Sequence, residues 1–379
     1  MTDRAVRSAL LFYPDNFFEM AAGTHRRVYE FVRYLKERQF CLDLMSLNGF
    51  TNMWDPAAFT KGKEFFNHIY VSDWPRGLPH RLQRFIRSAY RPLPDYVFPE
   101  MIHQVRETLD RSSFDFLIVN YVFWSRLAEI AGRAMTTVID IHDCMTLQQH
   151  MHRGGRSFSL GRMFQDEIAA IDRFDYALSI SEEETALFEP FCSHVRFVHA
   201  PIAFPERFLP EGKTKYHLLF VGSDNHFNKV GMRWFMDAVY PLLPEWISIC
   251  IVGQVTRFVS RKPNVTLIPH SEDLEKVYRD SRIVICPLRS GTGLKVKVIE
   301  ALSYGRPVVT TRWGLTGMTQ KSMNGCVVAD SEDDFARGVE RLIEDEDHYR
   351  AMREQAGNFF ASRFSPKVVW RGLDAVFGG

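Results

Sequence analysis

Residues 289–311 read RSGTGLKVKVIEALSYGRPVVTT. The apolar run before them, RIVICPL (282–288), is typical of a strand that is buried on both faces. The glycines predict a tight turn, residues 293–305 predict a helix closed by a glycine, and residues 306–311 predict the next strand. This order of strand, turn, helix and strand predicts a parallel sheet covered by helices.

Short apolar runs and amphipathic helices alternate through the rest of the chain. Further strands are predicted at 8–14, 41–47, 114–122, 136–143, 175–181, 195–201, 216–223, 247–254 and 265–270. Helices are predicted at 24–39, 227–243 and 271–281, the last with Ser271 as its N-cap. PIAFPERFLPEGKTK (201–215) holds three prolines and one glycine, which predicts a linker. We therefore expect an α/β protein of two Rossmann-like doubly wound domains that face each other across a cleft.

Composition excludes several classes of protein. The 379 residues carry 47 Lys and Arg against 46 Asp and Glu, so a net charge of +1 argues against a nucleic-acid partner. The six cysteines stand singly, without the spacing of a metal site or a disulfide scaffold. The N-terminal apolar run is too short for a signal peptide, and no run approaches the roughly 18 apolar residues of a membrane span. We expect a cytoplasmic protein.

The turn at 291–293 has the chemistry of an anion site. Glycines let a ligand approach the backbone, and the first N–H groups of a helix are unpaired. Lys295 and Lys297 add positive charge where the helix dipole disfavours it unless an anion binds. On the predicted helix, Gly293, Lys297 and Glu300 share one face. The third glycine of a dinucleotide fingerprint is replaced by Val296 and the P-loop pattern is missing, so the remaining alternative is an ordinary turn with solvated lysines.

The run GTGLKVKVIEALSYGRPVV (291–309) resembles the donor-site motif of GT-B nucleotide-sugar glycosyltransferases, in particular glycosyltransferase family 4 (group 1). VGSDNHFNKVGMRWFMDAVYPLLP (221–244) also looks like the first turn and helix of the family's C-terminal domain. The resemblance implies an acceptor-binding domain over 1–205 and a nucleotide-sugar-binding domain over 206–358. It also implies that the last helix, within 359–379, crosses back to the N-terminal domain.

By position, the resemblance assigns Glu300 to the ribose hydroxyls and Lys297 to the diphosphate. The other donor-side positions are Gly222, Ser223, His270, Gly291, Thr292, Gly293 and Lys295. Many members have a glutamate that contacts the donor sugar where this chain has Thr292. The donor sugar and the stereochemistry of transfer therefore stay open.

Two segments of the first half are candidates for the acceptor side. Gly23, His25 and Arg26 open a helix after the first strand, where the family often has a glycine-rich turn and a basic residue. The alternative is an ordinary loop. His142 and Asp143 follow the strand 136–143, and either side chain can orient or deprotonate an acceptor hydroxyl. His150 and His152 lack helical i, i+4 spacing and fall in a predicted polar loop, so we expect no metal or other cofactor.

RGLPHRLQRFIRSAYR (76–91) holds five arginines and no acid. As a helix it would be amphipathic and basic, which predicts contact with an anionic membrane surface or a phosphorylated lipid acceptor. The candidate residues for this contact are Arg81, Arg84, Arg87 and Arg91. The alternative is a solvated basic face over a packed apolar one.

The sequence thus predicts an enzyme, a hexosyltransferase-like glycosyltransferase. It would move a sugar from a nucleotide-diphosphate donor, UDP or GDP linked, to a hydroxyl of a glycan or lipid-linked acceptor, without a metal. Bacterial surface polysaccharide or glycolipid synthesis, in the cytoplasm or peripherally on the inner face of the membrane, is the expected setting. Two alternatives stay open, namely a sugar-nucleotide epimerase or hydrolase on the same fold and a non-catalytic nucleotide-binding scaffold.

Overall fold

The computed structural model describes residues 6–20, 23–77, 92–153, 159–210 and 212–378. The chain forms two compact units. Unit 1 comprises Met1–Pro201 with Trp370–Gly379, and unit 2 comprises Ile202–Val369. Each unit is an α/β layer structure with its own sheet and its own core.

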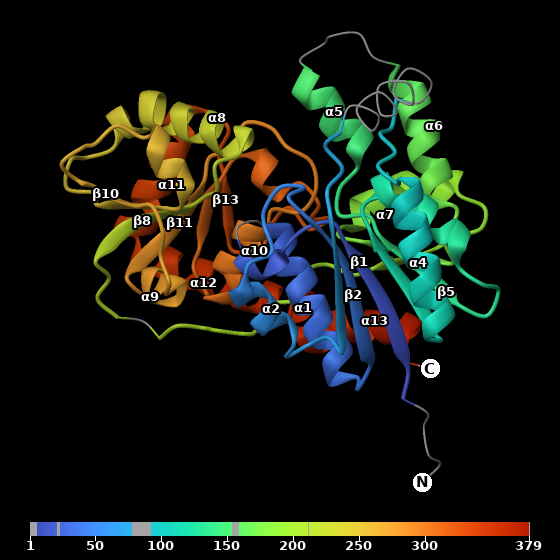
Figure 1. The fold of residues 1–379 in the computed structure, drawn as a ribbon. Helices are drawn as coiled ribbons and strands as arrows, with labels where there is room; N and C mark the ends of the chain where they lie inside the picture. The colour runs from blue at the N-terminus through green and yellow to red at the C-terminus, as the bar shows by residue number, and fades with distance from the viewer. Residues whose placement is uncertain (1–5, 21–22, 78–91, 154–158, 211, 379) are drawn as a thin grey trace. The chain divides into compact units, whose positions relative to one another are not determined.

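Unit 1 is built on a parallel seven-stranded sheet in the order β3-β2-β1-β4-β5-β6-β7 (Figure 1). The strands are β1 (Ser8–Tyr13), β2 (Cys41–Asn48), β3 (His68–Asp73), β4 (Phe116–Asn120), β5 (Thr136–Asp140), β6 (Tyr176–Ser179) and β7 (Arg196–His199). Continuous apolar runs form β1 and β4 because both faces of the sheet are covered by helices. Leu10 and Phe12 join the core on one face, while Ala9 and Leu11, also fully buried or nearly so, point to the other.

Helices cover both faces of this sheet. The core that contains Leu10 and Phe12 is completed by α4 (Pro99–Arg111), η2 (Val122–Ile130), α6 (Leu160–Ile171) and α7 (Glu182–Phe188). On the other face lie α1 (Gly23–Glu37) and the end of α13 (Pro366–Phe377), where Phe31 and Phe377 have ring centroids 5.6 Å apart. The shorter helices are η1 (Phe17–Glu19), α2 (Pro56–Gly62), α5 (Met145–Arg153) and η3 (Glu189–Phe191).

Unit 2 repeats this topology in a parallel six-stranded sheet of order β10-β9-β8-β11-β12-β13. The strands are β8 (Tyr216–Val221), β9 (Ile249–Val252), β10 (Val265–Ile268), β11 (Ser281–Cys286), β12 (Val308–Thr310) and β13 (Cys326–Val328). The helical segments are α8 (His226–Trp234), η4 (Phe235–Val239), η5 (Tyr240–Leu242), η6 (Gln254–Phe258), α9 (Leu274–Arg279), α10 (Val296–Ser303), η7 (Arg312–Leu315), α11 (Glu332–Glu344) and α12 (Glu346–Arg363). Residues of α8, η4, α11 and α12 build one core on the sheet.

The sequence-based elements are confirmed in type and order, with corrections at their ends. The helix predicted from Gly293 begins at Val296, so Gly293 lies outside the helix that carries Lys297. The helix predicted from 271 begins at Leu274 with Asp273 as N-cap, since Asp273 rather than Ser271 accepts from the N–H of Lys276. The predicted helix 227–243 changes to a π-turn at Phe235 and a 3₁₀ turn at Tyr240.

Other corrections concern elements that the sequence did not reveal. The edge strands β3 and β13 were not predicted, because β3 is half exposed and β13 spans only three residues. His150 and His152 lie in helix α5 rather than in a loop. The glycine that closes α10 is confirmed, because Gly305 adopts φ of +66° directly after the C-cap Tyr304.

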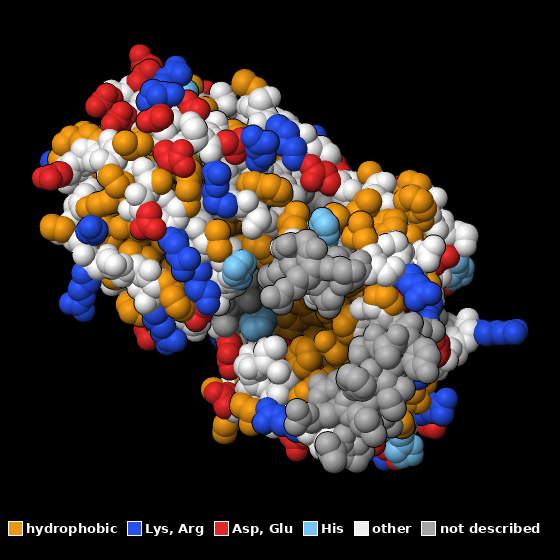
Figure 2. Space-filling view, turned by 90° about the horizontal axis from the view of Figure 1, so that it is seen from above, with side chains coloured by type: hydrophobic (Ala, Val, Ile, Leu, Met, Phe, Trp, Pro, Cys, Tyr) orange, Lys and Arg blue, Asp and Glu red, His pale blue; other side chains and the backbone are white. Residues whose placement is uncertain are grey.

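The surface in Figure 2 shows Lys, Arg, Asp and Glu side chains interspersed, without a large patch of one sign on the face in view. This agrees with the nearly balanced charge of the sequence. Among the helices of the described ranges, none has the length and apolar character needed to cross a membrane. Arg81, Arg84, Arg87 and Arg91, predicted to meet an anionic surface, lie outside the described residues.

Candidate functional site

The candidate donor site lies where the order of the unit 2 sheet changes direction. Strands β8 and β11 are neighbours, yet the chain leaves β8 toward β9 on one side and leaves β11 toward β12 on the other. Loops that follow such a strand pair separate and leave a crevice at the carboxyl ends of the strands. The turn after β8 contains Gly222 and Ser223, and the turn after β11 contains Gly291 and Gly293.

Close backbone approach explains the glycine at the end of β8. A Cβ atom on Gly222 would lie 2.5 Å from the ring of Phe220. The next strand reaches the same point, because Gly253 has φ of +102° and a Cβ there would lie 2.3 Å from the carbonyl oxygen of Gly222. A side chain at Gly253 would push apart the ends of β8 and β9, and a side chain at Gly222 would displace the Phe220 ring.

The second turn is shaped by three glycines. Gly291 and Gly293 have φ of +131° and +67°, a region that L-residues with a side chain rarely adopt. Gly317 packs against this turn from a distant loop, since a Cβ on it would lie 2.8 Å from the backbone nitrogen of Leu294. The ammonium group of Lys295 folds back and donates to the carbonyls of Thr292 and Gly293. Lys295 therefore holds the turn closed from within.

Lys297 is the cation of the first turn of α10. Its ammonium group donates to Oδ1 of Asn228 and lies 4.4 Å from the centroid of the Phe220 ring. Burial lowers the pKa of Lys297 to about 8, against a weaker opposing effect of the Cys286 thiol, and the nearby Lys295 lowers it further. In the part of the chain that the structure describes, Lys297 forms no ion pair with a carboxylate. At neutral pH this ammonium group is mostly charged and uncompensated.

Glu300 lies one turn along the same helix. Its Oε2 atom accepts a hydrogen bond of 3.3 Å from the hydroxyl of Tyr278, and Tyr278 stacks on Tyr304 with ring centroids 4.3 Å apart. The carboxylate remains partly exposed. Lys297 and Glu300 are three residues apart on α10, so they lie on neighbouring positions of one helix face. The ammonium group of Lys297 and the carboxylate of Glu300, which accepts hydrogen bonds, thus follow the glycine turn in that order.

The remaining donor-side predictions occupy different surroundings. Ser223 is half buried, and its carbonyl accepts 2.9 Å from the amide nitrogen of Asn228. Thr292 is half buried within the turn. His270 is exposed just beyond the carboxyl end of β10, which lies two strands away from β8 in the sheet.

In unit 1, the loop after β5 carries His142 in the left-handed region, with φ of +61°. The side chain is buried, and it stacks on Tyr121 with ring centroids 4.2 Å apart. Its Nε2 atom lies 2.9 Å from Oδ1 of Asn120. Burial lowers the pKa of His142 to about 4, although Asp140 opposes this shift. His142 is therefore neutral at pH 7, and its Nδ1 atom is buried without a hydrogen-bond partner.

A buried ion pair fixes the strand that leads to His142. The guanidinium group of Arg27, on α1, donates to both carboxylate oxygens of Asp140 at 2.9 Å and also donates to the carbonyl of Ala200. Burial raises the pKa of Asp140, but the charges of Arg27 and His142 outweigh it and hold the pKa below its ordinary value. This two-point contact ties α1 to the end of β5.

Of the residues that open α1, His25 comes close enough to His142 to affect its pKa. His25 is buried, its Nδ1 atom has no hydrogen-bond partner, and burial lowers its pKa to about 4. The Tyr13 ring has its centroid 6.2 Å from that of His25 and 6.3 Å from that of His142. Arg26 pairs with Glu30 at 3.0 Å, and Gly23 is the first residue of the helix. Two neutral imidazoles thus flank one tyrosine ring.

Glu184 holds the chain just beyond Asp143. Its Oε1 atom accepts a 3.3 Å hydrogen bond from the backbone N–H of Cys144, while its buried Oε2 atom has no partner. Burial raises the pKa of Glu184 to about 8, and the charge of Asp143 adds to the rise. A second buried carboxylate, Glu167, accepts from the N–H groups of Met145 and Thr146 that begin α5. The loop 141–146 is therefore fixed by the carboxyl groups of Glu184 and Glu167.

Comparison with known families is clear for unit 2. Residues 215–345 match the family described as glycosyl transferases group 1. This stretch of unit 2 is therefore similar to group 1 glycosyl transferases. This stretch contains both glycine turns, Lys297 and Glu300.

Curated relatives align over part of their length. A protein of the cps region of Klebsiella pneumoniae, described as an uncharacterized 44.6 kDa protein, is 26% identical over 194 residues, 46% of this chain and 49% of the relative. The capsular polysaccharide biosynthesis glycosyltransferase CapM of Staphylococcus aureus is 29% identical over 125 residues, 32% of each chain. The chain thus spans half or less of the length of these two relatives.

Solved structures share the fold over almost the whole chain. Sucrose-phosphate synthase from Thermosynechococcus elongatus is 12% identical with a TM-score of 0.71, over 98% of both chains. Anabaena Alr3699/HepE in complex with UDP and glucose is 12% identical with a TM-score of 0.68, over 98% of this chain and 99% of that one. WaaG, a glycosyltransferase involved in lipopolysaccharide biosynthesis, is 14% identical with a TM-score of 0.64, over 98% and 100%. The predicted α/β fold of GT-B type is confirmed.

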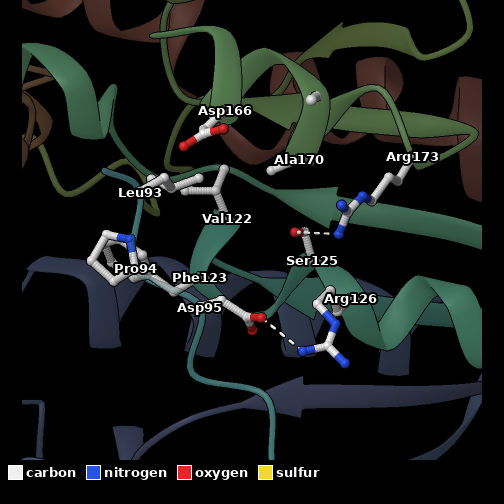
Figure 3. Close-up of a pocket in the computed structure, with 11 residues that line it drawn as sticks. Leu93, Pro94, Asp95, Val122, Phe123, Ser125, Arg126, Asp166, Ala170 and Arg173 are labelled. Carbon is white, nitrogen blue, oxygen red and sulfur yellow. Dashed lines mark hydrogen bonds and ion pairs between the residues drawn. The ribbon is translucent and has the colours of Figure 1, made fainter. Parts of the chain in front are cut away.

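A separate pocket of about 80 Å³ opens in unit 1 between η2 and α6 (Figure 3). Polar side chains that line the pocket bond to one another. Asp95 forms an ion pair of 2.7 Å with Arg126, and Arg173 donates a 3.5 Å hydrogen bond to the hydroxyl of Ser125. Asp166 also lines it, with one oxygen that has no partner. The pocket contains none of the sequence-predicted site residues.

Sequence reasoning missed the side chains that hold the functional groups in place. Asn120, Asn228 and Glu184 are polar and buried. Asn225 and Asn228 have the i, i+3 spacing of a helix cap, and Asn225 does cap α8. The sequence signals the cap, but it does not signal the second role of Asn228, because Lys297 is 69 residues away.

Proposed function

We propose that the protein is a glycosyltransferase that transfers a sugar from a nucleotide-diphosphate donor to an acceptor hydroxyl. The observation that carries this proposal is the uncompensated ammonium group of Lys297 beside the glycine turn at the start of α10. The free N–H groups of the helix, the bare backbone of Gly291 and Gly293, and this cation are all attracted to a diphosphate. The match of residues 215–345 to the group 1 glycosyl transferase family supports the assignment.

In this proposal, the diphosphate and the ribose of the donor lie one after the other along α10. The diphosphate lies against the glycine turn and Lys297, and the ribose hydroxyls donate to the carboxylate of Glu300. When the bond between the sugar and the diphosphate breaks, the diphosphate keeps the bonding electron pair. Lys297 and the helix dipole stabilise that new charge, so the transfer needs no metal. The complexes of Anabaena Alr3699/HepE with UDP support a UDP-sugar as donor, with a GDP-sugar as the alternative.

The acceptor hydroxyl forms the new bond to the sugar, and its proton passes to a base. We assign that base to Nδ1 of His142, which is unprotonated and has no partner. Asp143, the next residue of the same loop, is the alternative group that orients or deprotonates the acceptor hydroxyl. Gly23, His25 and Arg26 lie on the acceptor side in this proposal. Burial keeps His142 in its neutral form above about pH 4, and a neutral imidazole has a lone pair that can accept a proton.

The acceptor that we propose is a glycan or a lipid-linked sugar of surface polysaccharide or glycolipid synthesis. The names of the relatives from capsular and lipopolysaccharide synthesis support this. A peripheral position on the inner face of the cytoplasmic membrane fits a lipid-linked acceptor, with Arg81, Arg84, Arg87 and Arg91 as the cationic contact.

The test begins with thermal shift across UDP-, GDP- and ADP-sugars, followed by measurement of nucleoside diphosphate release with EDTA present. One donor class should raise the melting temperature, and Lys297→Ala and Glu300→Ala should each abolish most of that rise. Lys276→Ala, which removes an exposed lysine of α9, is the matched control and should behave like the wild type. Full donor binding and release by both site variants would disprove the assignment.

A further inference from the structure

We propose that Asn228 is a positioning residue that holds Lys297 against the donor diphosphate and couples it to the turn at Ser223. The proposal rests on the proposed function. It adds a residue of α8 that does not itself need to touch the substrate, and it explains how the two glycine turns act on one ligand.

The geometry of the amide is fixed by its two partners. The side-chain nitrogen of Asn228 donates 2.9 Å to the carbonyl of Ser223, in the turn after β8. A carbonyl accepts only, so this contact orients the amide and turns Oδ1 toward the ammonium group of Lys297, which donates to it. Asn228 is 3% exposed and forms part of α8, whose N-cap Asn225 binds the backbone N–H of Asn228 at 2.8 Å. The amide is therefore held on both sides.

An amide at position 228 can orient Lys297 without neutralising its charge, whereas a carboxylate would form an ion pair with it. Oδ1 of Asn228 accepts a hydrogen bond from Lys297 and restricts its long side chain, but it adds no negative charge. The Phe220 ring 4.4 Å below the ammonium group restricts it further, also without a formal charge. The positive charge therefore stays available for an anionic ligand, whereas an ion pair would already have neutralised it.

The charged and titratable groups around Lys297 support this reading. Lys295, in the turn before α10, repels it, and the Cys286 thiol at the end of β11 is the other titratable neighbour. The pKa of Lys297 falls to about 8 under burial and the effect of Lys295. A diphosphate that bound here would restore the ordinary pKa of the lysine, which is the expected behaviour of a preformed anion site.

The experiment compares full-length wild type with Asn228→Asp, Asn228→Ala and Ser331→Ala. Ser331 caps α11 and lies outside the donor turns. Its variant therefore controls for the loss of one hydrogen bond between a side chain and the backbone. The probes are UDP, GDP and ADP, with affinity measured by calorimetry at pH 7. In parallel, competitive acetylation with mass spectrometry follows the reactivity of Lys297 against pH, which reports its pKa without any nucleotide.

Asn228→Asp keeps the size of the side chain but supplies a carboxylate to Lys297. It should raise the pKa of Lys297 by roughly one unit or more and weaken binding of the best nucleotide at least about tenfold. Asn228→Ala should weaken binding several-fold by releasing Lys297, and Ser331→Ala should leave both readouts unchanged.

The two readouts separate the possible failures. An unchanged acetylation profile in Asn228→Asp, or nucleotide affinity within twofold of wild type, would overturn the positioning role of Asn228. Failure of the wild type to bind any of the three nucleotides would overturn the proposed function, and with it the ligand of Lys297. A weakening of equal size in Ser331→Ala would show a general effect of stability and would also overturn the proposal.

Discussion

The Nε2 atom of His142 lies 2.9 Å from Oδ1 of Asn120, and the nitrogen of the same amide donates 2.8 Å to the carbonyl of Phe12. The Phe12 carbonyl orients the amide, so its oxygen faces His142 and Nε2 must carry the hydrogen. The unprotonated nitrogen is then Nδ1, which has no partner. In unit 2 the amide of Asn228 relates to Lys297 in the same way. Each unit thus uses an asparagine to orient a candidate functional side chain without adding charge.

Asn120→Asp should change the protonation of His142. A carboxylate next to Nε2–H favours the imidazolium form, so the pKa of His142 should rise from about 4 toward neutrality. The acid limb of kcat/KM against pH should move to higher pH, because the base is then lost at higher pH. Asn264→Asp is the matched control, since that amide also donates to a carbonyl, of Ile247, and accepts from a side chain, of Tyr240. Equal shifts in both variants would contradict the assignment of His142 as the base.

His142→Ala should separate chemistry from donor binding. Loss of a general base typically reduces turnover by about 10²- to 10⁴-fold. Nucleotide affinity should stay within about twofold of wild type, because the donor turns and Lys297 belong to unit 2. Initial rates of nucleoside diphosphate release and calorimetric titration with UDP or GDP measure the two effects. His68→Ala, which removes a largely exposed imidazole of β3, should retain full activity. If His142→Ala turns over at the wild-type rate, another group accepts the proton.

Glu300 can be tested through the ribose itself. If its carboxylate accepts from the ribose hydroxyls, a 2′-deoxynucleotide should bind the wild type about tenfold more weakly than the ribonucleotide, since hydrogen bonds to charged groups contribute about 1.5–3 kcal/mol. Glu300→Ala should weaken the ribonucleotide and remove the difference between the two ligands. UDP and dUDP titrated into each variant decide the point. Discrimination that persists in Glu300→Ala would place the ribose contact elsewhere.

The local part of the candidate donor site was predictable from the sequence. Gly291, Gly293 and Gly305 signal backbone conformations that few other residues adopt, and the helical spacing of Lys297 and Glu300 follows from α-helix geometry. The type of most helices and strands, and their order along the chain, were likewise predictable from the periodicity of apolar residues.

What escaped prediction depends on contacts between distant residues or on side-chain direction. Gly317 lies so close to Leu294 that an added Cβ would come within 2.8 Å of the Leu294 backbone nitrogen. A hydrogen bond joins Asn120, at the end of β4, to His142, in the loop after β5. No local pattern encodes either approach. Lys295 illustrates the second limit, because its sequence position is that of a phosphate ligand, yet its ammonium group folds back onto its own turn. The roles proposed for Lys295 and His270 in donor binding stay predictions.

Gly317→Ala should damage the donor turn without touching its charges. Gly317 has φ of +85°, and an added Cβ would lie 2.8 Å from the nitrogen of Leu294, so both the backbone and the turn must shift. Backbone strain of this kind costs about 1–3 kcal/mol. We expect a lower melting temperature and nucleotide affinity reduced by about tenfold or more. Gly132→Ala, where an added Cβ has open space around it, is the control and should change neither. Normal nucleotide affinity in a destabilised Gly317→Ala would separate this loop from the site.

Glu184 predicts an unusual dependence of stability on pH. Its pKa is about 8 in the folded chain and near 4.5 when unfolded, so between these values the folded state keeps a proton that the unfolded state has released. Its contribution is therefore present below pH 4.5 and is lost as the pH rises toward 8. Between pH 6.5 and 8 the loss should be about 2 kcal/mol, at 1.36 kcal/mol per pKa unit.

Glu184→Gln isolates this effect, because the amide is neutral at every pH and its oxygen can still accept from the N–H of Cys144. Urea unfolding at pH 4.5, 6.5 and 8 should show similar stability of the two proteins at the lowest pH and a growing advantage of the variant at the highest. His25 and His142 shift stability only between about pH 4 and 6.5, and Asp15 only up to about pH 6, so the range from 6.5 to 8 avoids them. Parallel curves over that range would mean that burial and Asp143 do not raise the pKa of Glu184 in the folded protein.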